Sequence, residues 1–185
     1  MGVIVLIVVI VLVVAVALFL VAQYNGLIKL RNRIEAAWAQ IDVQLKRRYD
    51  LIPNLVETVK AYAGHERETL EAVIAARNAA ITATGEHEQA EAENAISGAL
   101  KSVFALSEAY PQLRANENFR ELQEELTSTE DKIAYSRQFF NDSVNKYNTK
   151  IQQFPAVLIA NSMGFKPREY FEAEGDARGN VRVQF

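Results

Sequence analysis

Residues Val3 to Ala22 read VIVLIVVIVLVVAVALFLVA, a run of twenty apolar residues, and no charged side chain occurs before Lys29. As a helix rising 1.5 Å per residue, this run would be about 30 Å long, which is the thickness of the hydrocarbon core of a bilayer. Twelve of its residues are Val or Ile, but a lone segment in lipid must satisfy its own backbone hydrogen bonds and therefore forms a helix. We predict a transmembrane anchor over residues 1–23.

A cleaved signal peptide is the alternative interpretation of this run. Ala15-Val16-Ala17 resembles a cleavage site, but it lies inside the apolar run and nothing basic precedes the run. We therefore expect the segment to remain as an anchor, with its residues contributing roughly −8 kcal/mol to insertion. The absence of polar residues within it argues against a pore or an ion pathway.

The charges that flank the run predict the orientation of the chain. Between Tyr24 and Arg48 there are six basic residues and two acidic ones. The basic residues are Lys29, Arg31, Arg33, Lys46, Arg47 and Arg48. Under the positive-inside rule, the N-terminus then lies outside and the large domain lies in the cytoplasm. Tyr24 stands where an aromatic anchor at the membrane interface belongs, and Lys29, Arg31 and Arg33 follow it as further interface residues.

The cluster Lys46-Arg47-Arg48 has two interpretations. It can bind anionic lipid headgroups, each cation near the surface adding about 1 kcal/mol, or it can only set the topology and form a solvated helix face. We leave both open. Nucleic-acid binding is not expected, because the chain carries a net charge of −3 and has no other dense basic cluster.

The remaining residues show apolar positions spaced alternately by three and four, which predicts amphipathic helices. Four segments have this pattern: Leu27 to Leu45, Ile52 to Ile81, Ala92 to Tyr110, and Phe119 to Phe154. Asp50 would cap the second segment, with Pro53 in its first turn. With connections at 49–52, 84–87 and 111–116, we predict an all-α fold: a single transmembrane helix followed by an antiparallel four-helix bundle of long helices over residues 24–154.

The pattern changes after Pro155. Residues 156–163 can form two helical turns with Gly164 as a C-cap, so we predict a short helix and docking segment over residues 155–171. Residues 172–185 are charged and contain Gly, which predicts a flexible tail. Val181, Val183 and Phe185 alternate at its end, and this tip is either an extended segment that adds to a groove or a frayed terminus.

Catalytic and metal-binding patterns are missing from the sequence. The chain has no cysteine, which excludes disulfides, thiolate metal sites and cysteine nucleophiles. A di-iron bundle needs Glu-x-x-His on two helices, but Tyr62 precedes His65 by three residues and Thr84 precedes His87 by three. The acids Glu121, Glu124 and Glu125 lie away from the predicted apolar face and are expected in solvent. We predict no enzyme activity, no cofactor and no metal.

The longest distinctive stretch is AWAQIDVQLKRRYDLIPNLV over residues 37–56, and it closely resembles the LemA family. The resemblance continues through Tyr62-Ala63-Gly64-His65-Glu66, Glu108-Ala109-Tyr110-Pro111, Asn118-Phe119, Thr129-Glu130, Tyr147-Asn148, Phe154-Pro155 and Gly164-Phe165. It implies a single-pass protein of the bacterial plasma (inner) membrane with an antiparallel helical bundle. It implies no activity and carries over no site residues.

From these observations we expect a membrane-anchored scaffold that self-associates as a homo-oligomer in the lipid bilayer. Tyr135, Phe139, Phe140 and Tyr147 spread over more than one stripe of the fourth helix, which suggests a second apolar contact face. The alternative is a monomeric adaptor that presents its bundle or C-terminal tip to a membrane protein partner, such as a membrane protease or an envelope-stress component. An unrecognised hydrolase or a small-molecule binder is a third class.

Overall fold

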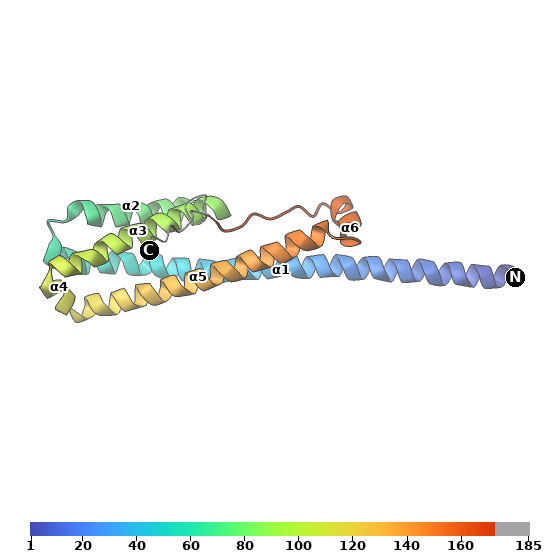
Figure 1. The fold of residues 1–185 in the computed structure, drawn as a ribbon, viewed down its shortest axis with the longest axis horizontal. Helices are drawn as coiled ribbons and strands as arrows, with labels where there is room; N and C mark the ends of the chain where they lie inside the picture. The colour runs from blue at the N-terminus through green and yellow to red at the C-terminus, as the bar shows by residue number, and fades with distance from the viewer. Residues whose placement is uncertain (173–185) are drawn as a thin grey trace, which may run out of the picture. The chain divides into compact units, whose positions relative to one another are not determined.

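A computed structural model describes residues 1–172, and all the regular secondary structure among these residues is helical. The helices are α1 (Gly2–Ala63), α2 (Arg67–Thr82), α3 (Glu86–Ala109), α4 (Pro111–Ala115), α5 (Glu117–Gln152) and α6 (Ala156–Ser162) (Figure 1). The all-α prediction is therefore confirmed for the described part of the chain. The tail predicted over residues 172–185 lies outside that part apart from Glu172, and its tip at Val181, Val183 and Phe185 lies wholly outside.

The chain divides into two compact units. Unit 1 comprises residues 1–40 and 138–169, and unit 2 comprises residues 41–137 together with the segment that begins at Tyr170. Helices α1 and α5 each contribute to both units.

Helix α1 runs without interruption for 62 residues. The predicted connection at residues 49–52 is therefore wrong, and Asp50 and Pro53 lie inside the helix. A proline at this position has no N–H to donate to the carbonyl of Tyr49, four residues earlier. The Arg77 side chain from α2 supplies the missing donor, because its Nε lies 2.7 Å from the Tyr49 carbonyl oxygen. The interior proline is thus accommodated by a partner from another helix, which local sequence patterns do not reveal.

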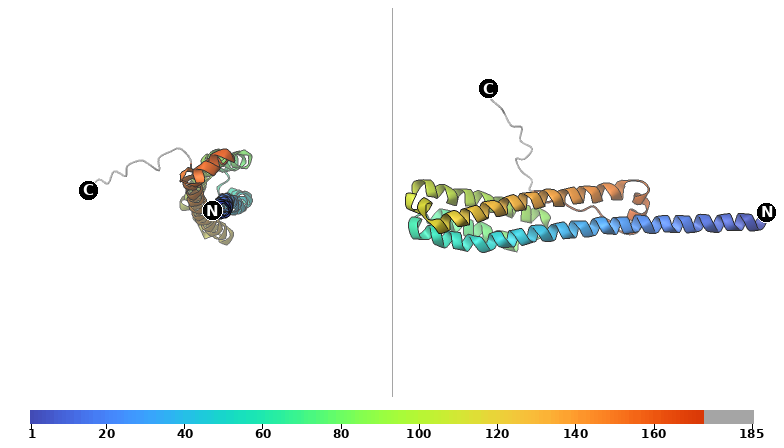
Figure 2. Two further views of the ribbon diagram at one scale, coloured as in Figure 1. Left: turned by 90° about the vertical axis from the view of Figure 1, so that its right-hand side faces the viewer. Right: turned by 90° about the horizontal axis from the view of Figure 1, so that it is seen from below.

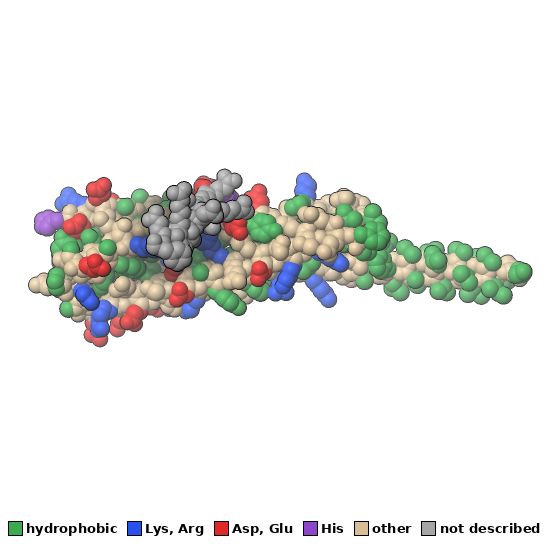
Figure 3. All heavy atoms as spheres, viewed as in Figure 1, with side chains coloured by type: hydrophobic (Ala, Val, Ile, Leu, Met, Phe, Trp, Pro, Cys, Tyr) green, Lys and Arg blue, Asp and Glu red, His purple; other side chains and the backbone are tan. Residues whose placement is uncertain are grey.

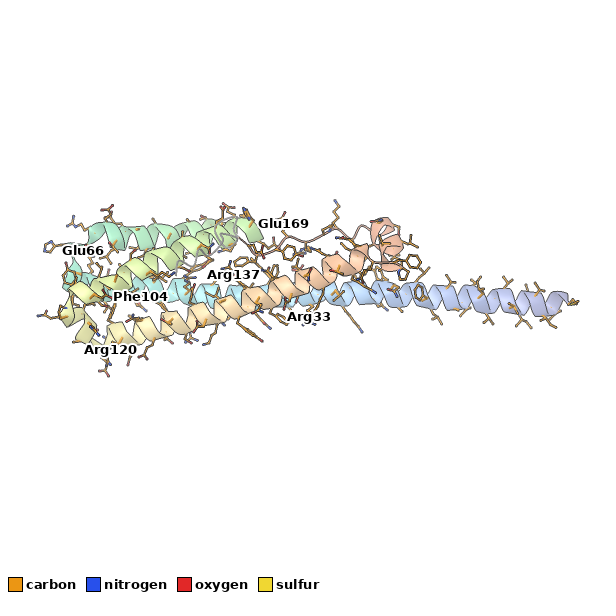
Figure 4. The ribbon with its side chains drawn as sticks, in the orientation of Figure 1. Arg33, Glu66, Phe104, Arg120, Arg137 and Glu169 are labelled. Atoms are coloured by element: carbon orange, nitrogen blue, oxygen red, sulfur yellow. The ribbon has the colours of Figure 1, made fainter. Side chains whose placement is uncertain are left out.

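The turn that ends α1 occurs at Gly64, within the segment that the apolar spacing had predicted as one helix. A Cβ atom at this position would lie 2.9 Å from the carbonyl oxygen of Lys60. The backbone can therefore approach this closely only because residue 64 has no side chain. Glu66, labelled in Figure 4, follows the turn and accepts a hydrogen bond of 2.9 Å from the Tyr110 hydroxyl.

Unit 2 is built around one apolar core. Helices α2 and α3 lie side by side as an antiparallel pair joined by residues 83–85 (Figures 1 and 2). The core residues come from α1, α2, α3, α4 and α5, and the fully buried ones include Ile52, Leu55, Val59, Val73, Ile96, Val103 and Leu113. The short helix α4 occupies the connection predicted at residues 111–116, and Pro111 takes its first helical position, which proline favours.

Unit 1 contains the apolar N-terminal stretch. Residues 2–22 of α1 are exposed throughout and project beyond α6 (Figures 1 and 2), and Figure 3 shows their apolar side chains on the surface. The rest of unit 1 buries Leu27, Ile34, Phe140 and Val144. The half-buried Trp38 ring packs against Phe140 with 5.4 Å between centroids.

Helix α6 completes unit 1. It ends at Ser162 with Met163 as its C-cap residue, and the following Gly164 has a positive φ of 73°, the left-handed geometry predicted for a glycine that closes a helix. A short helix thus lies within the segment predicted over residues 155–171, and docking by the rest of that segment stays a prediction.

Candidate functional site

Arg48 is the largest fully buried side chain in the described part of the protein, with 2% of its surface exposed. It lies on α1 three residues after Leu45 and four before Ile52, which are both buried. This spacing continues the core stripe of an amphipathic helix, so helical periodicity carries Arg48 into unit 2. A buried guanidinium requires acidic and hydrogen-bonding partners, because its desolvation otherwise costs several kcal/mol.

Two carboxylates and a hydroxyl surround the Arg48 guanidinium. Arg48 Nη1 donates to Glu93 Oε2 at 3.2 Å, and Arg48 Nη2 lies 2.9 Å from Glu130 Oε2. Arg48 Nη2 also lies 2.6 Å from the Ser97 hydroxyl oxygen, which in turn donates to Glu130 Oε1 at 2.8 Å. The group therefore joins α1, α3 and α5 within unit 2. We call Arg48, Tyr49, Gln89, Glu93, Ser97 and Glu130 the Arg48 network.

Glu93 is the acidic centre of the Arg48 network and is 1% exposed. Its second oxygen accepts hydrogen bonds from the Tyr49 hydroxyl and, at 2.9 Å, from Gln89 Nε2. Gln89 Nε2 also lies 2.8 Å from the Tyr49 oxygen. Both carboxylate oxygens of Glu93 are thus satisfied by groups of the same chain.

The electrostatics of the Arg48 network follow from burial. Burial raises the pKa of Glu93, while the Tyr49 and Gln89 hydrogen bonds and the Arg48 charge oppose this shift. Burial and the neighbouring Glu93 carboxylate together raise the pKa of Tyr49 above its ordinary value. Tyr49 therefore remains a neutral hydrogen-bond donor at physiological pH. The network is closed, and its members are engaged with one another.

Arg137 is a second cation beside the Arg48 network. It lies on α5 and is labelled in Figure 4. Its guanidinium carbon is 4.9 Å from the centre of the Phe171 ring, and Phe171 is fully buried. Burial lowers the pKa of Arg137, an effect opposed by Glu130, Glu93 and Glu172. Phe171 thus attaches the end of the described chain to unit 2.

The structure divides the predicted basic cluster. Arg48 is buried in unit 2, so it does not belong with the surface cations and does not face lipid. Lys46 and Arg47 are exposed, and Arg47 forms an ion pair with Glu125 on α5. Lipid binding or topology setting by Lys46 and Arg47 stays a prediction. The prediction is wrong for Arg48 because adjacent residues on a helix point about 100° apart, so three neighbouring charges do not share one face.

The predicted interface residues all lie in unit 1. Tyr24 is 38% exposed, and its ring contacts Phe165 edge-on with 5.8 Å between centroids. Lys29, Arg31 and Arg33 are exposed. The Arg33 guanidinium (Figure 4) lies 4.9 Å from the centre of the Phe139 ring. A membrane role for these four residues stays a prediction.

Sequence reasoning missed Glu93. Its signal is a charged residue at a core position, because Glu93 lies three residues before Ile96 and seven before Leu100, and both of these are buried. Arg48 shows the same signal on α1. A pair of opposite charges at core positions of two helices predicts a buried ion pair.

The other acidic candidates lie where they were expected. Glu121, Glu124 and Glu125 are exposed, and they line a shallow open groove of unit 2 with Arg47 and Asn54. Across residues 1–172, no three His, Asp or Glu side chains come together in an arrangement that could hold a metal ion.

Helix α1 begins with an exposed apolar stretch and continues into a helical unit that contains a buried ion-pair network. Over residues 1–172 these features define an all-helical protein with a membrane-type N-terminal segment. By length and composition α1 can cross a membrane. The LemA family profile matches residues 37–185, and the chain belongs to the LemA family. The resemblance found in the sequence is thereby confirmed.

Several named relatives cover most of the chain. Magnetosome protein MamQ of Magnetospirillum gryphiswaldense is 25% identical over 178 residues, which make up 82% of this chain and 65% of the relative. Magnetosome protein MamQ 1 of Paramagnetospirillum magneticum is 24% identical over 179 residues, which make up 83% of this chain and 66% of the relative. Protein LemA of Metamycoplasma hominis is 26% identical over 165 residues, or 87% and 74% of the two chains. The chain thus spans about two thirds of the length of the MamQ proteins.

Proposed function

We propose that this protein is a non-enzymatic helical scaffold, anchored in the bacterial inner membrane by residues 1–23, that associates with copies of itself. The observation that carries the proposal is the uninterrupted helix α1, whose exposed apolar stretch continues directly into residues that form both compact units. An anchor that continues as a helix transmits the orientation of the span to the folded residues, as a scaffold requires.

In this proposal the folded residues form an antiparallel four-helix bundle. Its support is the shared core of unit 2, to which α1, α2, α3 and α5 all contribute buried residues. The Arg48 network specifies how the helices pack and does not act as a reactive site, because the chain supplies the partners of Arg48 and the charges are paired. In this proposal the network fixes the register of the bundle helices.

A second candidate, the monomeric adaptor, is favoured by one specific observation. Three of the four aromatic residues expected on a second contact face are packed within unit 1: Phe139 beneath Arg33, Phe140 against Trp38, and Tyr147 with its hydroxyl on the Lys166 carbonyl. Only Tyr135 is largely exposed, at 74%. These aromatic residues therefore support self-association less than the sequence alone indicated. The membrane spans of neighbouring copies become the main candidate contact.

The oligomeric state separates the two proposals. Full-length protein in a mild detergent should behave as a multimer by light scattering, and crosslinking in native membranes should yield the same multimer. The Val13→Arg variant should stay anchored, since one arginine costs about 3 kcal/mol of insertion energy, less than the span provides. It should nevertheless lose the multimer, because a charge between neighbouring spans disrupts their packing. A single chain in both experiments would replace the scaffold with the adaptor.

A further inference from the structure

Three large apolar side chains outside the predicted span are exposed on unit 1. Phe154, just before α6, is 80% exposed, Leu158 within α6 is 65% exposed, and Met163 at its end is 58% exposed. The opposite face of α6 is buried through Ala156, Ile159 and Ala160. Leu158 is thus an exposed apolar residue on the outer face of α6, which also carries Asn161 and Ser162, and Phe154 and Met163 flank the helix at its two ends. A patch of this kind on a folded surface marks a contact with a membrane or another protein.

The segment that carries this patch is held firmly in unit 1. The Tyr147 hydroxyl donates to the carbonyl of Lys166 at 3.0 Å. The Asn148 side chain donates to the carbonyl of Arg168 and accepts from its N–H, both at 2.9 Å. The residues after α6 are thus fastened to α5, and the exposed side chains belong to a fixed element.

The patch lies at the level where the apolar run of α1 ends. Phe165, two residues after Met163, contacts the Tyr24 ring, and Tyr24 is only about 3 Å along the helix axis from Ala22. Figure 3 shows apolar side chains gathered at α6, beside the point where the apolar stretch of α1 leaves the rest of unit 1. The exposed apolar residues at α6 therefore lie beside the end of the span.

The charges around the patch are mainly positive, although Arg168 forms an ion pair with Glu35 at 2.8 Å. Residues 143–168 include four Lys or Arg residues and no Asp or Glu: Lys146, Lys150, Lys166 and Arg168. On the neighbouring part of α1, Lys29, Arg31 and Arg33 precede the first acid, Glu35. An apolar face bordered by cations matches the boundary between anionic headgroups and acyl chains.

We propose that Phe154, Leu158 and Met163 insert into the headgroup–acyl boundary of the bilayer that α1 crosses, so that unit 1 binds the membrane surface as well as spanning it. The occupant of the patch is a bilayer containing anionic phospholipid. This inference rests on the proposed anchoring by residues 1–23. A second attachment beside the span restricts its tilt, because the α6 end of unit 1 must stay at the interface.

The absence of cysteine from the chain makes a direct test possible. Full-length variants carrying one cysteine each, Leu158→Cys or Met163→Cys, are labelled with an environment-sensitive fluorophore. They are reconstituted in vesicles of phosphatidylcholine and phosphatidylglycerol, with and without lipid bearing a nitroxide quencher. Val13→Cys reports on the span, and Tyr135→Cys, on an exposed position of unit 2, is the control for solvent. These side chains are exposed, so labels there leave the packing intact.

We expect the nitroxide lipid to reduce the emission of labels at positions 13, 158 and 163 about twofold or more, and to leave position 135 unchanged. If position 13 is quenched while 158 and 163 behave like 135, the interface proposal is wrong and the anchor stands. If position 13 is also unquenched, the anchor itself is wrong. Disulfide crosslinking of Leu158→Cys between chains, without lipid quenching, would assign the patch to a second copy and overturn the proposal.

Discussion

Arg48 shows how one residue position combines helical periodicity with electrostatics. Its place in the core stripe of α1 forces burial, and burial forces pairing with Glu93 and Glu130. Arg48 and Glu93 are both desolvated, whereas Glu130 is partly exposed. Removing either Arg48 or Glu93 therefore leaves the other buried charge without compensation, which costs far more than the intact pair contributes. The adjacent Arg47 is exposed and pairs with Glu125 at the surface, so it is a natural control.

Replacing Arg48 with Met should lower the free energy of unfolding by about 3–5 kcal/mol, because it leaves Glu93 buried and unpaired. Arg47→Met should change it by about 1 kcal/mol or less, since its ion pair is solvated. The double variant Arg48→Met/Glu93→Met should recover part of the loss. Denaturant unfolding of the full-length protein in mild detergent, followed by circular dichroism, measures all three. Equal small effects of Arg48→Met and Arg47→Met would contradict the buried network.

Glu93 should also make stability depend on pH. Burial raises its pKa in the folded protein above the ordinary value of 4.5. The stability linked to its protonated form is therefore fully present below that value and is lost as the pH rises through the folded pKa. The Tm of the native protein, minus that of Glu93→Gln, should fall as the pH is raised above 4.5. A difference that stays constant or grows with pH would show that the pKa is not raised.

At the scale of elements, periodicity predicted most of the helices, while their boundaries depended on contacts between elements. The apolar spacing identified α3 and α5, whose ends are followed by Pro111 and Pro155, and Gly164 marked the end of the short helix α6. The connection predicted at residues 49–52 is wrong, since Pro53 is tolerated inside α1 and the donor that replaces its N–H comes from Arg77 on α2. The helical spacing of the sequence is sufficient to place the charges of Arg48 and Glu93 at core positions. Their partners Gln89 and Ser97 depend on how α3 packs, which the spacing does not predict.

The Pro53–Arg77 relationship predicts a coupled effect. Arg77→Met should destabilise the protein by about 1–2 kcal/mol, because it leaves the Tyr49 carbonyl without its donor. In the Pro53→Ala background the cost should be smaller, since the new backbone N–H at position 53 can bond to that carbonyl within the helix. A double-mutant cycle measured by denaturant unfolding gives the coupling energy. Strictly additive effects would show that Arg77 does not compensate for the proline.

At the scale of the whole molecule, the charge distribution and the apolar run predict how the chain sits in a cell. Six of the residues between Tyr24 and Arg48 are basic, and none of the residues before the span carries a basic side chain. The burial of Arg48 does not alter this argument, because topology is set by the charge of the chain during insertion, before the domain packs.

Protease added to intact spheroplasts should therefore leave the helical domain uncut, whereas permeabilised cells should lose it. Moving positive charge to the other side, by adding three lysines after Gly2, should weaken this protection. Digestion of the domain in intact spheroplasts would place it outside and would transfer every partner hypothesis to the periplasmic face.

Graded charge substitution within residues 3–22 tests whether this run anchors the protein in the membrane. The run contributes roughly −8 kcal/mol to insertion, and each Val→Asp substitution costs about 3 kcal/mol. After alkaline carbonate extraction, the native protein and Val13→Asp should remain in the membrane pellet, while the triple variant Val8→Asp/Val11→Asp/Val13→Asp should appear in the supernatant. Extraction of the native protein, or retention of the triple variant, would contradict the account.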